Sequence, residues 1–230
     1  MAQELGRISR PSAAQYEGRR KLLLVPLVYG PSAEAPEGVA ALQKYWGQMQ
    51  VQVESLQAAL GGLHHVYHES LCESGQQALE QLEKADQRSH QFVKAKCEAG
   101  AVLEATEDAE ALMETLDLQR CLLMPLSSEK VAIKLHEWFN ESNKSRYDHI
   151  ASQIDATLGE NEVGLLLVSE RHQIQFPEDI EVFYVAPPAL SEFQRWLENW
   201  AVQQQKAPEE QTTEEPGDAP QEQDAEAEEI

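Results

Sequence analysis

The chain is poor in cysteine, in basic residues and in long apolar runs. Its 230 residues include three cysteines, and 18 Lys and Arg stand against 40 Asp and Glu, which gives a net charge of −22. Three widely spaced cysteines do not form a disulfide framework and are typical of reduced thiols, so we expect a cytoplasmic protein. No run approaches the ~18 apolar residues of a membrane-spanning helix, so we expect no membrane segment.

The acidic charge lies both in the body of the chain and at its C-terminal end. Residues 22–206 hold 13 Lys and Arg against 28 Asp and Glu, and residues 207–230 hold ten Asp and Glu with no basic residue. Nucleic-acid binding depends on Lys and Arg that neutralise phosphates, so nucleic acids are unfavourable partners. Residues 206–230 lack the apolar content that would offset the entropy of ordering, and we expect a disordered acidic tail. Residues 1–20 are expected to be a flexible basic lead-in.

Three apolar runs predict buried strands. Val163–Val168 and Val182–Val185 are short and rich in branched or aromatic residues, and a polar segment separates them. Lys21–Val25 is a third such run. Pro26 limits it, because proline cannot donate to a strand ladder, so this strand either ends there or lies at an edge. Weaker strand candidates are Leu63–Ser70, Ala101–Ala105 and Cys121–Met124.

Amphipathic helical patterns alternate with these strands. The clearest has apolar residues spaced alternately by four and three, which is typical of a helix that packs along one seam; they are Leu42, Trp46, Met49, Val53, Leu56 and Leu60. A weaker pattern covers 76–97. Thr106 predicts a helix cap, with Glu107, Asp108 and Glu110 stabilised in the first turn. Further helices are expected from Ser127 or Ser128 to Gly159, either interrupted at 140–145 or continuous, and after Pro187-Pro188.

This alternation predicts an α/β fold, in which residues 21–205 form one domain with a mainly parallel or mixed sheet and long amphipathic helices packed on it. Two alternatives stay open. The N-terminal helices could form a separate hairpin, with a boundary near 100–126. Val163–Val185 could instead be an antiparallel hairpin, because the residues between its two runs are few for a parallel crossover with a helix. Gln173–Phe176 could add a short strand.

A histidine cluster, His64, His65 and His68 with Glu69, is the first candidate for a metal site. On a helix it could supply three zinc ligands. The segment follows two glycines and contains Val66 and Tyr67, so a strand is favoured. On a strand His64 and His68 lie about 13 Å apart, too far for one ion. We expect no metal site here. Neither common glycine-rich nucleotide fingerprint occurs in the sequence, and we expect no cofactor.

Two functions from different classes are compatible with the sequence. The first is a non-catalytic interaction or regulatory protein, whose acidic tail could contact a basic partner; a homo-oligomer is also open. The second is an enzyme or small-ligand-binding protein with a site at the carboxyl ends of the strands, where open α/β sheets bind ligands. This second hypothesis places five residues around one pocket: Tyr29, His68, Ser169, Arg171 and His172. Both an enzyme and a non-catalytic protein are therefore compatible with the sequence.

Overall fold

A five-stranded parallel sheet forms the centre of the protein. The computed structural model describes residues 16–30 and 35–206, and the strand order is β3-β2-β4-β1-β5. The strands are β1 (Arg20–Leu27), β2 (His65–His68), β3 (Val102–Leu103), β4 (Val163–Ser169) and β5 (Ile180–Tyr184). All four neighbouring pairs are parallel. The predicted α/β class is confirmed, and the antiparallel hairpin considered for the last two strands is wrong.

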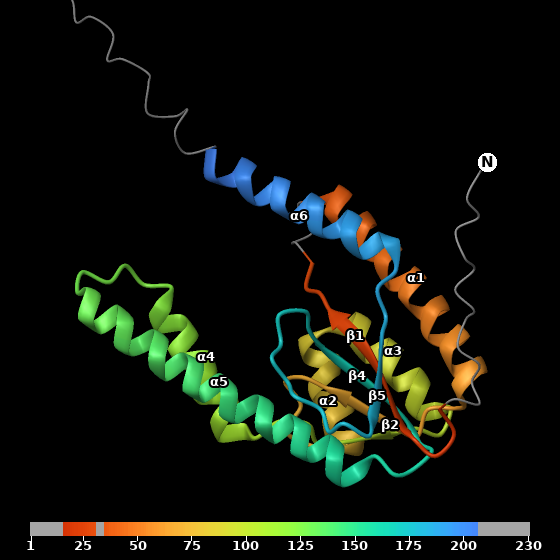
Figure 1. Cartoon of the computed structure of the whole chain (residues 1–230). Coiled ribbons are helices and arrows are strands. Elements are labelled where there is room, and N and C mark those ends of the chain that lie inside the picture. Colours follow the sequence, from red (N-terminus) through yellow and green to blue (C-terminus); the bar gives the residue numbers. More distant parts are fainter. Residues whose placement is uncertain (1–15, 31–34, 207–230) are drawn as a thin grey trace, which may run out of the picture.

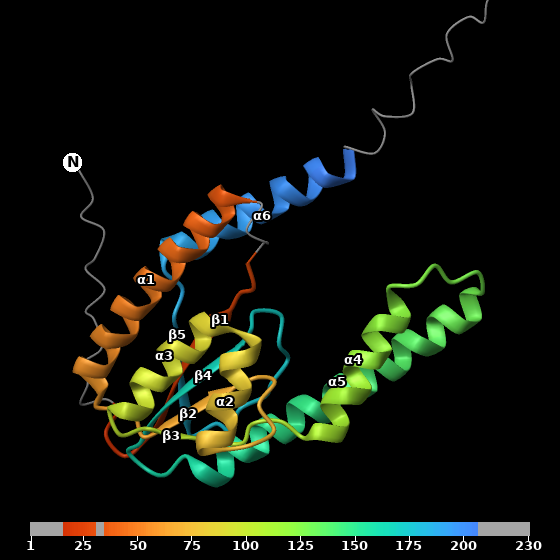
Figure 2. The ribbon, with the colours of Figure 1, turned by 180° about the vertical axis from the view of Figure 1, so that it is seen from behind.

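Helices cover both faces of the sheet (Figures 1 and 2). They are α1 (Pro36–Leu60), α2 (Gly75–Ala85), α3 (Gln87–Glu98), α4 (Ala109–Leu122), α5 (Glu129–Thr157) and α6 (Pro188–Lys206). Apolar residues of α1, α2, α3 and α6 share one core cluster with the sheet. The C-terminal part of α5 packs on the opposite face. The α4–α5 hairpin extends away from the sheet, and no described helix is apolar enough over a sufficient length to cross a bilayer.

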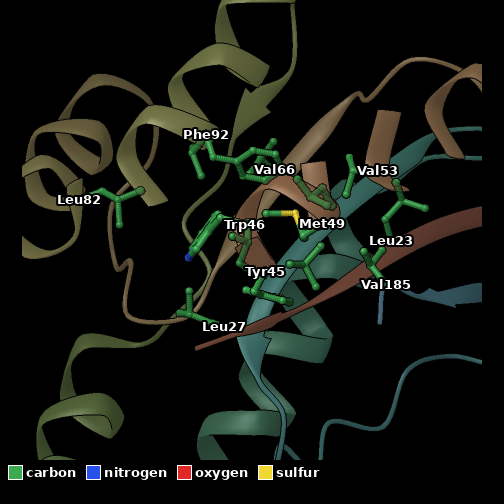
Figure 3. Packing of buried hydrophobic residues seen from close by; sticks show 14 of the residues in the cluster. Leu23, Leu27, Tyr45, Trp46, Met49, Val53, Val66, Leu82, Phe92 and Val185 are labelled. Atoms are coloured by element: carbon green, nitrogen blue, oxygen red, sulfur yellow. The ribbon is translucent and has the colours of Figure 1, made fainter. Parts of the chain in front are cut away.

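The larger core cluster lies between α1, α3 and the sheet (Figure 3). The predicted apolar stripe of α1 is buried at Leu42, Trp46, Met49 and Val53. Trp46 meets the ring of Phe92 edge-on, with 5.9 Å between ring centroids. Full burial of side chains of this size stabilises the fold by about 1.5–3 kcal/mol each. The residues that the helical spacing placed on one face of α1 are therefore those that pack against the sheet.

Pro26 lies inside a strand that is itself interior, which neither sequence alternative anticipated. β1 pairs with β4 on one side and with β5 on the other. The pairing with β5 stops at Leu24, whose carbonyl accepts the N–H of Val185. The N–H groups of Leu24 and of position 26 point to the same side in a strand. Pro26 therefore lies beyond the end of β5, where no ladder hydrogen bond is lost.

The connection from β4 to β5 contains no helix and crosses over β1. Ile174 is buried in it and Phe176 is half-buried, and both pack with Ile150 and Ile154 of α5. Two side chains thus cover the sheet where a crossover helix usually does so. The short strand considered at Gln173–Phe176 is not formed. A compact irregular connection explains how so few residues join two parallel strands.

Several element boundaries differ from the prediction. The 76–97 pattern is two helices, because Asp86 caps α3 by accepting the N–H of Arg88. α5 runs without interruption through 140–145, a polar stretch with neither Gly nor Pro. Cys121–Met124 is not a strand but the end of α4 and a turn. The prediction for the tail, and most of that for the lead-in, falls outside the described residues.

Candidate functional site

A cavity of about 1360 Å³ opens at the carboxyl edge of the sheet. Its floor comes from residues that directly follow three neighbouring strands: Tyr29 after β1, Glu69 and Ser70 after β2, and Ser169 at the end of β4. The facing wall comes from the α4–α5 hairpin, including Leu112, Thr115, Asn143, Arg146 and Tyr147. The site therefore lies between the sheet and a helical hairpin that projects from it.

The topology of the sheet places an opening at this edge. The helices that follow β1 and β2 pack on one face. The segments that follow β3 and β4 pack on the other face. β4 lies between β2 and β1 in the sheet. The chain therefore leaves β4 toward one face of the sheet and leaves its two neighbours toward the other face. A crevice beyond the carboxyl ends is expected where this happens, and it is the usual ligand position in open α/β sheets.

Four of the five residues selected from the sequence line this cavity: Tyr29, Ser169, Arg171 and His172. Arg171 and Tyr29 are exposed, whereas Ser169 and His172 are half-buried. Burial lowers the pKa of His172, which packs edge-on against Phe176. The structure thus brings these four residues together from two strands, although what they contact in a complex stays a prediction.

The fifth residue, His68, does not line the cavity. Its side chain points into the interior and is 2% exposed, with Nδ1 against the backbone carbonyl of Glu69. Nε2 has no hydrogen-bond partner within the described ranges. Burial lowers the pKa of His68 to about 4, so the ring is neutral at physiological pH. Adjacent residues of a strand point to opposite faces, and here Glu69 takes the cavity position.

A buried charged cluster forms the inner end of the cavity. Arg146 of α5 grips the carboxylate of Glu107 with two nitrogens; Nε lies 2.7 Å from Oε2, and Nη2 contacts Oε1. Glu107 also accepts the backbone N–H of Ser70 at 3.2 Å. Its side chain is fully buried, and that of Arg146 is 11% exposed. This pair joins α5 to the loop after β3 and to the end of β2.

Glu69 is the second carboxylate of this cluster, and it faces the cavity. Its side chain is 7% exposed, and Oε2 lies 3.8 Å from Nη2 of Arg146, beyond hydrogen-bond distance. Burial raises the pKa of Glu69, while the backbone N–H and hydroxyl of Ser169 and the charge of Arg146 act in the opposite direction. Ser169 supplies at most two hydrogen-bond donors to this carboxylate, whereas an ionised carboxylate has about four acceptor sites. Glu69 is thus a nearly buried carboxylate with acceptor sites left over.

The sequence interpretation assigned Glu107 to helix capping, and this assignment is wrong. Asp108 caps α4 by accepting the N–H of Ala111, and Thr106 instead accepts the backbone N–H of His68. Glu107 precedes the cap and turns inward. One sequence signal could have revealed its partner, since Arg146 stands four residues before Ile150 on the buried face of α5. An arginine at that position needs a buried anion.

The remaining wall of the cavity combines side-chain amides with charged groups and with the apolar side chains of Leu116 and Phe139. It includes side-chain amides from α4, α5 and the β4–β5 connection: Gln119, Asn140, Asn143, Gln173 and Gln175. Lys144 also lines it, and its ammonium pairs with Asp148 at 2.6 Å. Arg171 has no ion-pair partner in the described part of the chain. Charge of both signs and many hydrogen-bonding groups therefore face one space.

The candidate histidine cluster does not converge. His64 accepts the backbone N–H of Val163 through Nδ1. His65 contacts Glu104 at 2.8 Å and Glu162 at 3.1 Å through its two ring nitrogens. His68 points elsewhere, into the core. Among residues 16–30 and 35–206, no group of three or more His, Cys, Asp or Glu is arranged to hold a metal ion.

Comparison of the chain with protein-family models, with curated proteins and with solved structures gave no match.

Proposed function

We propose that the protein binds a small polar molecule in the cavity at the carboxyl edge of the sheet. The observation that carries this proposal is Glu69, a carboxylate that is more than nine-tenths buried yet faces an open space lined by polar groups. The cavity also lies where parallel sheets of this kind bind ligands. A binding function needs only these features, and catalysis is not required by them.

The energetics of Glu69 argue against a purely structural role. Burying a carboxylate without full hydrogen bonding costs free energy, and apolar residues of similar volume are often as stable or more stable. Arg146 is already matched by Glu107, so the structural pair does not need a second anion. Retained polar groups that weaken a fold are typical of binding sites. Glu69 is therefore better explained by a ligand than by packing.

The test measures the melting temperature of the full chain with panels of amino acids, sugars, nucleosides and carboxylic acids. Asn143→Trp places a large ring in the cavity and should abolish the stabilisation that a bound compound gives. Ser145→Trp is the matched control, because Ser145 is exposed on the same helix and does not line the cavity. Absence of any stabilising compound, or an equal loss in both variants, would contradict the proposal.

A second candidate is the interaction function, which exposed apolar side chains on the α4–α5 hairpin favour. Six large ones lie there: Met113, Leu123, Met124, Val131, Ile133 and Trp138. Leu123, at 80% exposed, is the most accessible. The simplest partner is a second copy of the chain, and sedimentation velocity of the full chain against Leu123→Ser tests it. A monomer at all concentrations would remove this candidate.

Contact between the acidic tail and a basic partner also stays a proposal, because residues 207–230 lie outside the described part of the chain. The cytoplasmic location expected from the cysteines also stays a proposal.

A further inference from the structure

We infer that the molecule bound in the cavity is a small zwitterion, whose ammonium group contacts Glu69 and whose anionic group lies near Arg171. This inference rests on the proposed function and deepens it by naming the chemistry of the ligand. Three observations carry it: the charge balance of the buried cluster, the groups around Glu69, and the difference in depth between Glu69 and Arg171.

The buried cluster carries one negative charge in excess. It contains one guanidinium, that of Arg146, and two carboxylates. Glu107 uses the guanidinium through two nitrogens at hydrogen-bond distance, whereas Glu69 stands 3.8 Å from it. A buried carboxylate whose charge is only partly balanced is stabilised by a proton or by a further cation. The open side of Glu69 faces the cavity, so a cation from the ligand can occupy it.

The surroundings of Glu69 suit an organic cation better than a metal ion. Ca²⁺ requires six to eight oxygen ligands, and no group of three or more His, Cys, Asp or Glu among the described residues is arranged to hold a metal ion. The hydroxyls of Ser70, Ser169 and Tyr29 line the same cavity and can accept N–H groups. The ring of Tyr147 already lies 5.7 Å from the guanidinium of Arg146 and offers a surface for cations. An ammonium group can use all of these contacts.

The outer part of the cavity has the opposite character. Arg171 is exposed and lines the cavity without an ion-pair partner in the described ranges, and Lys144 lies on the helix side. Lys144 is neutralised by its ion pair with Asp148, which also lines the cavity, so Arg171 supplies the unmatched outer charge. A ligand that presented only positive charge would be repelled by Arg171, whereas an anionic outer end would be attracted by it. The order of charges, anion inside and cation outside, therefore selects a zwitterion over a simple amine.

Isothermal titration calorimetry with the ω-amino acids from glycine to 6-aminohexanoate tests the inference, with the N-acetyl derivative of each as its control. We expect at least one chain length to bind, and its N-acetyl form to bind at least tenfold more weakly because the ammonium is gone. Butylamine and butyrate separate the two ends, and each should bind more weakly than the matching zwitterion. Equal binding of an amino acid and its N-acetyl form would overturn the inference.

Two variants assign the ends to residues. Glu69→Gln should weaken zwitterion binding at least tenfold, whereas Glu170→Gln, the matched control, should not change it, because Glu170 accepts from Gln194 of α6 and does not line the cavity. If circular dichroism shows that Glu69→Gln does not fold, Arg171→Gln is used instead, because Arg171 is exposed and its replacement should not affect folding. It should weaken the zwitterion but not butylamine. Unchanged zwitterion affinity in the folded variants would reject the assignment.

The binding results also distinguish a failure of this inference from a failure of the proposed function. Suppose that a sugar or nucleoside binds, that Asn143→Trp abolishes this binding, and that no amino acid binds. The cavity is then a ligand site, and the inference that its ligand is a zwitterion is wrong. If no compound of any class binds, the proposed function fails and the inference fails with it.

Discussion

Glu107 and Arg146 lie 39 positions apart in the chain and form a buried ion pair through two guanidinium nitrogens. The pair fastens α5, and with it the α4–α5 hairpin, to the end of the sheet, because Glu107 also holds the backbone N–H of Ser70. It therefore decides where one wall of the cavity stands.

Breaking this pair should destabilise the protein strongly. Glu107→Gln leaves the guanidinium of Arg146 without its matched anion, and loss of one partner of a buried ion pair costs about 3–5 kcal/mol. We expect the lower end of that range, because Glu69 stands close enough to compensate in part. Urea denaturation measures the free energy of unfolding. Glu110→Gln, on the exposed first turn of α4, is the control and should change it little; a loss below ~1 kcal/mol for Glu107→Gln would contradict the role given to the pair.

Replacing Glu69 should raise the free energy of unfolding in the absence of ligand, whereas replacing Glu107 lowers it. Its pKa is raised by burial, so the folded state holds a proton more tightly than the unfolded state, and stability is lost as the pH rises through the folded pKa. Glu69→Gln removes this loss, and we expect a gain of about 1 kcal/mol at neutral pH. Urea denaturation from pH 3 to pH 8 should show the variant and the parent converge at acidic pH. A destabilised variant at neutral pH would mean that Glu69 supports the fold.

His68 should make the protein sensitive to acid. Its pKa falls from 6.5 to about 4 on folding, so the unfolded state binds the proton first as the pH drops. The free energy of unfolding should therefore decrease from pH 6.5 to pH 4, with a full loss of about 3 kcal/mol. His68→Gln should flatten this part of the stability profile, measured by urea denaturation. His136→Gln, on the exposed side of α5, is the control, and an equally flat profile there would exclude His68 as the cause.

Two glycines of α1 should respond to alanine in opposite directions. A methyl group at Gly38 would stand 2.1 Å from the ring of Trp196, so Gly38→Ala should push α6 away and cost about 1–3 kcal/mol. A methyl group at Gly47 meets nothing within 4 Å, and Gly47→Ala should stabilise the helix by about 0.5–1 kcal/mol. Thermal unfolding of both variants checks the pair. The same sign for both would show that α6 does not pack against Gly38 in solution.

Local patterns predicted the elements whose burial repeats along the chain. The apolar stripe of α1 and the apolar run of β4 are buried or half-buried along their whole length. The spacing of their apolar residues therefore reveals the type of element directly. Prediction failed where a contact with a distant segment decides the local structure. Pro26 is tolerated in an interior strand only because β5 ends at that level. Asp86, by contrast, splits one apparent helix through a local cap, the N–H of Arg88 donating to its carboxylate, which the apolar spacing does not show.

The candidate site divides in the same way. Tyr29, Ser169, Arg171 and His172 could be selected because each follows a predicted strand, and parallel strands end at one edge. Glu69, Glu107 and Arg146 could not be assembled from the chain, because the two carboxylates have ordinary local explanations in a strand end and a helix start. The position of Arg146 on the buried face of α5 signals a buried anion but does not identify it. Only the folded structure shows that Arg146 pairs with Glu107 and that Glu69 is an additional carboxylate, which this ion pair does not need.

By itself, the order of apolar and polar residues determined that this protein is an α/β fold with amphipathic helices packed on a mainly parallel or mixed sheet, because hydrophobic periodicity records which face of each element is buried. The tertiary structure alone decided the strand order, the position of the α4–α5 hairpin and the inward turn of Glu107. Those features depend on charges and shapes that meet from distant parts of the chain, and no local pattern encodes such a meeting.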